Sequence, residues 1–317
     1  MSAARDLDLL VLGDVNPDLV LADASLDVAF GQAETLVEDA ALTIGGSGAI
    51  MACAAARLGL RTALAGLVGE DQFGAFMLQA VSARGVDVSA VVVDAGVRTG
   101  LTVVLARPGD RAILTFPGAI AAMTAERVDP GVLARARHVH VSSFYLQTAL
   151  APGLPRLLAA ARAGGATTSM DPNWDPSGGW DGGLRALLGE IDVLAPNAVE
   201  ACRIAGVDDV EAAAARLAAR GPLVAVKLGA AGALLVPAGG GAVVRAQPPP
   251  APAEPVDAVG AGDTFDAGLL AGLLAGEPPA DALGLACACG ALSLRAAGGT
   301  GAQPTLEEAM ASRPGGG

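Results

Sequence analysis

The chain has 317 residues, of which 52% are hydrophobic and only 3% aromatic, so it can bury a large core of small aliphatic side chains. Its formal net charge of −13, with no basic stripe along the sequence, excludes nucleic acid as a partner. No apolar run is long enough to span a membrane and the N-terminus lacks a secretory signal pattern, so we expect a cytoplasmic protein without membrane contact. The four cysteines show no Cys-x-x-Cys spacing, and we interpret them as buried small residues.

The first predicted element is a strand over residues 7–13, a continuous apolar run typical of burial on both faces. It leads into Asp14-Val15-Asn16-Pro17-Asp18, at the carboxyl end of a strand, where open α/β sheets place their ligands. A simple Asn-Pro-Asp turn is the alternative. Further on, Gly45-Gly46-Ser47-Gly48 precedes a predicted helix over 49–58, and such a turn lets a ligand approach the backbone.

Two stretches predict short strands away from the main sheet. Residues 21–44 alternate in places and carry no helical stripe, and residues 101–106 with 112–116 predict a β-hairpin. We expect these stretches to form a small separate sheet. Such a sheet over a ligand site would act as a lid.

The remaining chain alternates between strands and helices, which predicts a mostly parallel sheet with helices on both faces. The predicted strands are 62–68, 88–93, 138–142, 166–170, 191–194 and 223–228, with a hairpin over 232–245. The predicted helices are 72–85, capped by Asp71, then 125–136, 154–163, 211–220, 264–276 and 278–297.

The most informative stretch is Asp257–Gly268, in which a turn of Gly260, Ala261 and Gly262 runs into a long apolar helix. The first N–H groups of a helix are unpaired and its dipole adds partial positive charge, so this turn can receive a phosphate. Asp263 lies inside the turn, where it can accept a proton from a hydroxyl that attacks the phosphate. We expect the dipole to lower the pKa of Asp263. The alternative is that Asp263 is only a helix cap.

Asn197 and Glu200 are three residues apart at the start of a predicted helix and point the same way. An amide and a carboxylate there can bind the water shell of Mg²⁺, and an ordinary helix cap is the alternative. A Walker loop is absent, and no G-x-G-x-x-G follows the first strand, which argues against a dinucleotide-dependent oxidoreductase. His138 and His140 alternate on a predicted core strand, and we interpret them as structural rather than catalytic.

Taken in order, these motifs resemble the PfkB (ribokinase-like) sugar and nucleoside kinases over essentially the whole chain. Residues 257–263 resemble the second signature of that family. The other matching stretches are 16–18, 45–49, 54–59, 66–74, Pro196-Asn197-Ala198-Val199-Glu200, and Lys227-Leu228-Gly229-Ala230-Ala231-Gly232-Ala233.

The resemblance implies a fold and an activity. The expected fold is a ribokinase-like, three-layer α/β domain over 1–317, with a β lid formed by 15–44 and 97–117. The expected reaction is ATP-dependent phosphorylation of a primary hydroxyl on a small sugar or related polyol. A nucleoside is the alternative acceptor, and a non-catalytic regulator that binds sugar or nucleotide is a further alternative. The expected cofactors are ATP, Mg²⁺ and K⁺, and the exposed lid edge predicts a homodimer.

The resemblance also implies roles for individual residues. Asp263 matches the catalytic base, and Gly260, Ala261 and Gly262 match the turn whose amides stabilise the transferred phosphoryl group. The positions that match sugar-binding residues are Asn16, Asp18, Gly45 and Gly46, and those that match nucleotide-binding residues are Asn197, Lys227, Gly229 and Gly232. Glu200 matches a residue that organises Mg²⁺ through water. The monovalent-cation loop of potassium-activated members is matched by Asp257, Val259, Ala296, Gly299 and Gly301.

The chain departs from the family pattern at two places that concern the acceptor. Ile50 stands where members usually carry Asn, and an apolar side chain cannot bond a hydroxyl, so we expect one sugar contact to be lost or supplied elsewhere. After Asp171-Pro172-Asn173, where many members have Arg two residues on, this chain has Trp174 and Asp175. Phosphosugars are the less favoured acceptors, because the arginines near the lid, Arg98, Arg107 and Arg111, form no evident cluster.

Overall fold

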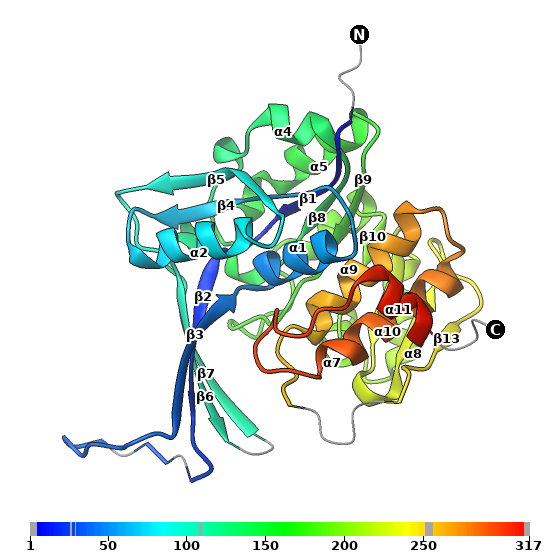
Figure 1. Ribbon diagram of the computed structural model, residues 1–317. Helices are drawn as coiled ribbons and strands as arrows, with labels where there is room; N and C mark the ends of the chain where they lie inside the picture. The colour runs from blue at the N-terminus through cyan, green and yellow to red at the C-terminus, as the bar shows by residue number, and fades with distance from the viewer. Residues whose placement is uncertain (1–4, 26, 29, 108–109, 251–255, 314–317) are drawn as a thin grey trace.

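The computed structural model describes residues 5–25, 27–28, 30–107, 110–250 and 256–313. Its largest element is a nine-stranded sheet in the order β13-β12-β11-β10-β9-β8-β1-β4-β5 (Figure 1). The strands are β1 (Leu7–Leu12), β4 (Thr62–Gly69), β5 (Asp87–Asp94), β8 (Ala136–Val141), β9 (Thr167–Met170), β10 (Val193–Leu194), β11 (Leu223–Lys227), β12 (Ala233–Val236) and β13 (Val244–Ala246). β12 runs antiparallel to both neighbours and the other pairings are parallel, so the expected mostly parallel sheet is confirmed.

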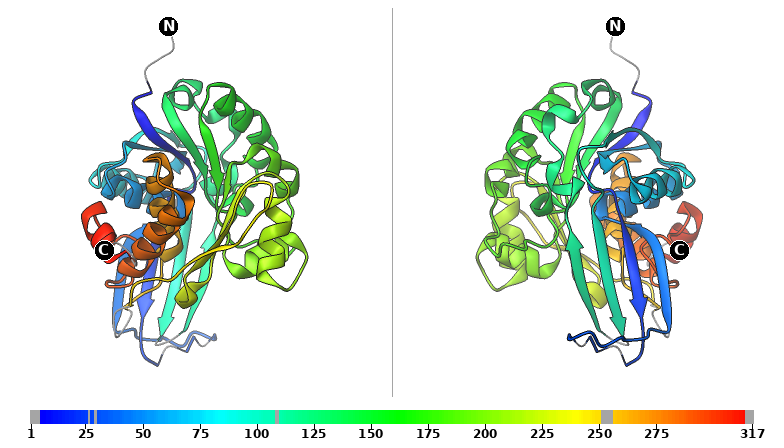
Figure 2. Two further views of the ribbon diagram at one scale, coloured as in Figure 1. Left: turned by 90° about the vertical axis from the view of Figure 1, so that its right-hand side faces the viewer. Right: turned by 90° about the vertical axis from the view of Figure 1, so that its left-hand side faces the viewer.

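Helices cover both faces of this sheet (Figure 2). The side chains of β1 alternate between two cores: Leu9 and Val11 enter one, and Leu10 and Leu12 enter the other. The first core also contains residues of α1 (Ser47–Arg57), α2 (Gln72–Ser82), α9 (Ala261–Leu274), α10 (Pro279–Ser293) and α11 (Leu306–Ser312). The second contains residues of α3 (Ala119–Ala122), α4 (Pro130–Arg135), α5 (Leu154–Ala163), α6 (Leu184–Leu187), α7 (Ala198–Ala205) and α8 (Val210–Ala218). The expected layered α/β arrangement is therefore present.

A second sheet, of four strands, projects from the main body at the carboxyl end of β1 (Figure 1). Its order is β3-β2-β6-β7, with β2 (Asn16–Ala22), β3 (Asp39–Gly45), β6 (Leu101–Arg107) and β7 (Asp110–Phe116). β2 follows β1 almost directly, and every residue of β7 is exposed. The segments 15–44 and 97–117 also include residues 26, 29, 108 and 109, which lie outside the described residues.

Two expected helix boundaries are wrong for local reasons. The helix expected over 125–136 is interrupted: a 3₁₀ turn over Ala125–Arg127 precedes α4, because Pro130 suits the first helical position and Asp129 accepts a bond from the Gly131 N–H at 2.8 Å. α9 begins at Ala261 rather than at residue 264, which brings the glycine turn into the first turn of the helix. Asp71 caps α2 as expected. None of the described helices combines the length and the apolar character needed to cross a membrane.

Candidate active site

The order of the strands places a crevice beside β1. From β1 the chain adds β4 and β5 on one side and later returns to add β8 on the other side. Open α/β sheets bind ligands where the strand order reverses in this way, outside the carboxyl ends of the strands. Asp14 follows β1 closely, Ser142 and Ser143 follow β8, and Asp171 follows β9.

Four residues expected to bind the sugar lie together at the base of the second sheet. Asn16 on β2 pairs with Gly45 on β3. A Cβ added at Gly45 would overlap the Asp18 carboxylate, and one added at Gly46 would lie 2.8 Å from Asn16 Oδ1. Asn16 Oδ1 is buried and has no hydrogen-bond partner among the described residues. Burial, together with Asp14, raises the pKa of Asp18 to about 7.

Asp14 holds the glycine turn that follows. Its carboxylate accepts bonds from the backbone N–H of Ser47 (3.2 Å) and Gly48 (2.8 Å), at the start of α1. A Cβ on Gly48 would lie 2.6 Å from the Gly13 Cα, so these two glycines allow β1 and α1 to approach closely. The Ser47 hydroxyl accepts a bond from Asn173 Nδ2 at 2.8 Å, which connects this turn to the end of β9.

The turn expected to receive the phosphate is the start of α9. Gly260 is the residue that precedes the helix, with φ +73°, and no side chain caps this helix. Asp263 is thus not the N-cap, which removes the alternative left open by the sequence. A Cβ on Gly260 would lie 2.7 Å from both the Cα and the carbonyl oxygen of Gly299, so the turn packs against the backbone of that loop. The N–H groups of Gly262 and Asp263 lie in the first helical turn and have no partner within the helix.

The expectation that the helix dipole lowers the pKa of Asp263 is wrong. The side chain is buried, and burial together with the negative charge of Asp171 raises its pKa to about 8. Lys227 and the Ser47 hydroxyl act in the opposite direction but do not outweigh burial. Asp263 therefore binds its proton at neutral pH in the absence of ligands.

Lys227, the one lysine of the chain, lies at the end of β11 with its ammonium between two carboxylates. Its Nζ is 2.7 Å from Asp171 Oδ2 and 3.0 Å from Asp266 Oδ2. Burial alone would raise the pKa of Asp171, but Lys227, Asp266 and His140 together outweigh burial and the pKa is lowered. Burial would lower the pKa of Lys227, but the two carboxylates raise it, so the ammonium stays charged.

Asn197 and Glu200 form a reciprocal cap at the start of α7. Asn197 Oδ1 accepts from the Glu200 N–H at 3.0 Å, and Glu200 Oε2 accepts from the Asn197 N–H at 2.9 Å. The Asn197 side-chain amide also donates to Glu200 Oε1 at 2.6 Å. The capping arrangement, which the sequence left open, is thus present. Burial and the nearby Asp171 raise the pKa of Glu200 to about 7.

The remaining expected positions form two backbone turns. Gly229 and Gly232 bound a short turn directly after Lys227, both with positive φ, and Gly229 faces open space. Asp257 joins two loops, because its carboxylate accepts bonds from the Val259 N–H and the Gly298 N–H, each at 2.9 Å. The other positions expected to bind the cation, Ala296, Gly299 and Gly301, belong to the second of these loops.

Ile50, the first departure from the family pattern, is part of the buried core beside α9. It is 3% exposed, and its side chain packs where Cβ atoms of Gly260 and Gly299 would lie. Its backbone carbonyl accepts a bond from Gln303 Nε2 at 2.9 Å. Ile50 therefore packs under the turn and supports Gly260, and the loss or replacement of one sugar contact at this position stays a prediction.

His138 and His140 are buried and bonded to hydroxyl groups of β9. His138 contacts Thr167 Oγ1 (2.7 Å) and Ser169 Oγ (2.6 Å), and His140 contacts Ser169 Oγ at 2.7 Å. Burial lowers the pKa of His138 to about 3 and of His140 to about 4, so both are neutral. These contacts support the structural interpretation.

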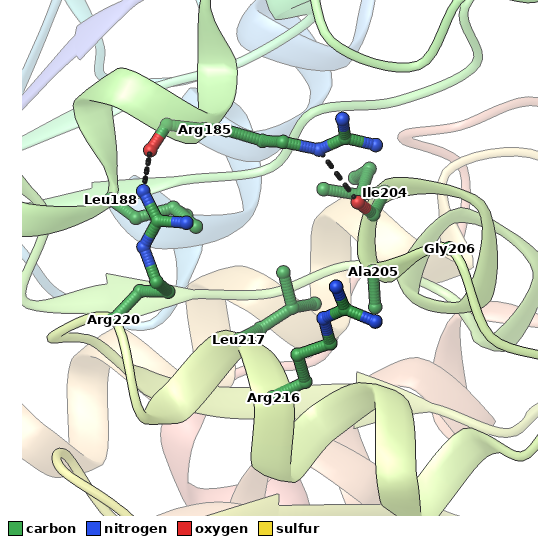
Figure 3. A pocket seen from close by; sticks show the side chains of 8 residues that line it. All are labelled: Arg185, Leu188, Ile204, Ala205, Gly206, Arg216, Leu217 and Arg220. Atoms are coloured by element: carbon green, nitrogen blue, oxygen red, sulfur yellow. Dashed lines mark hydrogen bonds between the residues drawn. The ribbon is translucent and has the colours of Figure 1, made fainter.

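A separate cavity of about 330 Å³ is lined by residues of α6, α7 and α8 (Figure 3). Arg185 Nε donates to the Ile204 carbonyl at 3.0 Å, and Arg220 Nη2 donates to the Arg185 carbonyl at 3.1 Å. Its lining residues include none of the expected site residues, so the cavity does not belong to the site.

Sequence reasoning missed three acidic residues that build the site: Asp14, Asp171 and Asp266. Asp14 lies two residues after β1 and Asp171 directly follows β9, and that position alone is a signal for a ligand-binding edge. Asp266 lies three residues after Asp263 on one helix, which predicts a shared face. Asp14 contacts the Gly45–Gly48 turn, and Asp171 and Asp266 contact Lys227. These contacts are visible only in the folded chain.

Comparison with known proteins identifies the family of the chain. The family described as pfkB family carbohydrate kinase matches residues 6–306. A fructokinase from Klebsiella pneumoniae is 34% identical over 287 residues, covering 84% of this chain and 91% of that protein. An ATP-dependent ribose-1-phosphate kinase from Halopiger xanaduensis (strain DSM 18323 / JCM 14033 / SH-6) is 32% identical over 304 residues, covering 96% and 97%.

A solved structure shares the fold. A candidate ribokinase II from E. coli, solved with ATP and Mg²⁺, superimposes with a TM-score of 0.82 at 25% identity, over 96% of this chain and 98% of that one. The ribokinase-like fold expected from the motifs is therefore confirmed. The chain belongs to the pfkB family and is a carbohydrate kinase.

Proposed function

We propose that this kinase transfers the terminal phosphoryl group of ATP to a primary hydroxyl of a small neutral sugar or related polyol, with Asp263 as the catalytic base. The observation that carries the proposal is the placement of the Asp263 carboxyl in the first turn of α9. It caps nothing, it is buried, and its pKa responds to Asp14 on the sugar side and to Lys227 on the other side. The names of the fructokinase and of the ATP-dependent kinase among the relatives support the sugar and the nucleotide.

In this mechanism the acceptor hydroxyl donates its proton to Asp263 as its oxygen attacks the terminal phosphorus and the bond to the ADP oxygen breaks. The amides of Gly260, Ala261 and Gly262 stabilise the negative charge on the phosphoryl oxygens during transfer. Asn16 and Asp18, with the backbone of Gly45 and Gly46, hold the other hydroxyls of the acceptor. A raised pKa makes Asp263 a stronger base once it is ionised.

We also propose that the nucleotide binds beside Asn197, Gly229 and Gly232, with Mg²⁺ held by its phosphates and, through water, by Glu200. Bound Mg²⁺ would neutralise phosphate charge. The buried Glu200 carboxyl, with a pKa of about 7, fits a neighbouring cation. Within the described residues no group of three or more His, Cys, Asp or Glu side chains is arranged to hold a metal.

A K⁺ ion is proposed at the two loops that Asp257 joins. Its ligands would come from Asp257 and from the backbone at Val259, Ala296, Gly299 and Gly301. The close approach of Gly260 to Gly299 brings the two loops together at one place, which supports this proposal. Bound K⁺ would stabilise the turn that begins α9.

An uncharged acceptor is favoured by how the nearby cations are used. The Arg98 guanidinium lies 4.7 Å from the centre of the Phe116 ring, Arg107 pairs with Asp110 at 2.8 Å, and Arg111 lies 3.8 Å from Asp257. Asp175, where an arginine is common in the family, accepts bonds from Ser177 and Trp180 and stabilises its own loop. None of these groups is placed to recognise a phosphate or carboxylate on the acceptor, and the acids of the site would repel one.

The test is a coupled ADP assay with ribose, fructose, ribose-1-phosphate, 2-keto-3-deoxygluconate and adenosine. We expect ADP release with ribose or fructose at least 100-fold above the acceptor-free rate. Turnover of the two anionic acceptors, ribose-1-phosphate and 2-keto-3-deoxygluconate, should be at least about tenfold slower, because the site offers their charged group no charge-assisted hydrogen bond. Adenosine is included because Trp174, 60% exposed beside Asn173, offers a face on which a base can stack. Preference for an anionic acceptor, or no turnover with any of them, would contradict the proposal.

We propose that the enzyme acts in the cytoplasm, where its free cysteines stay reduced. We also propose that the four-stranded sheet is a lid within a single kinase domain and that two such lids join in a homodimer. Ile113 and Leu114 on β7 are 56% and 59% exposed and lie on opposite faces of the strand. We expect light scattering at micromolar concentration to give a dimer, and Ile113→Lys/Leu114→Lys to give a monomer. Met310→Lys, on α11, is the matched control and keeps the dimer; a monomeric wild type would contradict the proposal.

A further inference from the structure

Lys227 was expected to contact the nucleotide, but its ammonium is already occupied. Its Nζ donates to Asp171 Oδ2 at 2.7 Å and to Asp266 Oδ2 and Oδ1 at 3.0 and 3.3 Å. An ammonium has three donors, so these bonds leave none for a phosphate oxygen. The three side chains are 13%, 4% and 2% exposed for Lys227, Asp171 and Asp266, so the group is removed from solvent.

The same residue joins the elements that build the site. Asp171 follows β9, and Asp266 lies on α9 one turn beyond Asp263. The backbone N–H of Lys227 donates to the Pro196 carbonyl at 2.9 Å and forms a parallel bridge with Asn197, the cap of α7. Its side chain also lies against the turn: a Cβ on Gly262 would be 3.6 Å from Lys227 Nζ.

We propose that Lys227 is a positioning residue, which fixes the first turn of α9 on the ends of β9 and β11 and makes no contact with the nucleotide. The inference rests on the function proposed above, because that turn holds the proposed base and phosphoryl-binding amides. Without the ammonium, Asp171 and Asp266 would be two adjacent buried acids facing Glu200, Asp263 and His140, all of which sense this group. Burial already raises the pKa of Asp266 well above its usual range, so Asp171, whose pKa the ammonium helps to lower, must then take a proton or move, and either change shifts the turn.

The test compares Lys227→Met with Lys227→Met/Asp266→Leu, in which an apolar pair replaces the ion pair. We expect Lys227→Met to lose roughly 100-fold in kcat, because a displacement of the first turn of α9 by about 1 Å has an effect of that size. The Kd for ATP, measured by calorimetry without acceptor, should stay within about threefold of the wild-type value. The double variant should regain part of the urea midpoint lost by the single variant, because an apolar pair replaces Lys227 and Asp266 while Asp171 stays buried without its cation. Its kcat should stay low, since the link from β11 to Asp171 is still missing.

Two outcomes overturn the inference. A loss of ATP affinity of tenfold or more in both variants would make Lys227 a nucleotide ligand, and recovery of kcat in the double variant would make its role one of stability alone. If Lys227→Met does not fold, the double variant and Lys227→Arg, which keeps the charge, carry the comparison. Failure of the proposed function is seen separately, as a wild type that releases no ADP, and the ATP affinities then still decide whether Lys227 contacts the nucleotide.

Discussion

Replacing Asp263 by Asn is expected to lower kcat by roughly 10²–10⁴-fold, the range of a lost general base, while the Kd for ATP stays within about threefold. The amide keeps the shape of the carboxyl but cannot take the proton of the acceptor hydroxyl. The variant should fold normally, because burial raises the pKa of Asp263 to about 8 and the resting side chain is already neutral at pH 7. ADP release measures the rate, calorimetry measures ATP binding, and urea unfolding measures stability.

The same assignment fixes the sign of the pH dependence. The base works only when ionised, so kcat/KM, which reports the free enzyme, should rise with pH through about 8 in the wild type, and Asp263→Asn should lose this rise. Asp209→Asn is the matched control, because it makes the same change at the start of α8 and Asn also caps helices well. Near-normal turnover in Asp263→Asn, or a wild-type profile that is flat from about pH 6 to 9, would remove Asp263 from the role of base.

The elements that position the site were predictable because their signals are local. The apolar run of β1, the polar residues after it and the glycine turn before α9 each depend on neighbouring residues, and the structure places them where the patterns indicate. Helix starts were less predictable where glycines were involved. α9 begins inside the turn because Gly260, with φ +73°, supplies the change of direction, leaving Ala261 and Gly262 free to be helical.

The electrostatics of the site could not be predicted in the same way. The sign of the pKa shift at Asp263 depends on whether the helix dipole or burial is larger, and burial is set by segments far apart in the chain. Asp171, Lys227 and Asp266 come from three such segments. No local sequence pattern therefore predicts their ion pairs, or that the ammonium of Lys227 uses all three of its donors in them. The packing of Ile50 against Gly260 and Gly299 also has no local signal, because these residues are far apart in the chain.

Replacing Gly260 by Ala should reduce turnover at least 100-fold and also lower the free energy of unfolding. An L-residue at φ +73° costs about 1–2 kcal/mol, and the added Cβ would lie 2.7 Å from the Cα and the carbonyl oxygen of Gly299. Because the obstacle is backbone, the turn itself must move away from the loop, carrying the amides and Asp263 with it. A displacement of about 1 Å at such groups is enough for a 100-fold loss. Urea unfolding and ADP release measure the two effects.

The control is Gly276→Ala, at the other end of the same helix. Gly276 has φ +82°, close to that of Gly260, but nothing lies within 4 Å of an added Cβ. This variant therefore isolates the cost of the backbone conformation, about 1 kcal/mol, with turnover unchanged. The difference in stability and turnover between the two variants measures the effect of the contact between the added Cβ and Gly299. If Gly260→Ala matches Gly276→Ala in both stability and turnover, the turn tolerates displacement, and the phosphoryl group is not held by its amides.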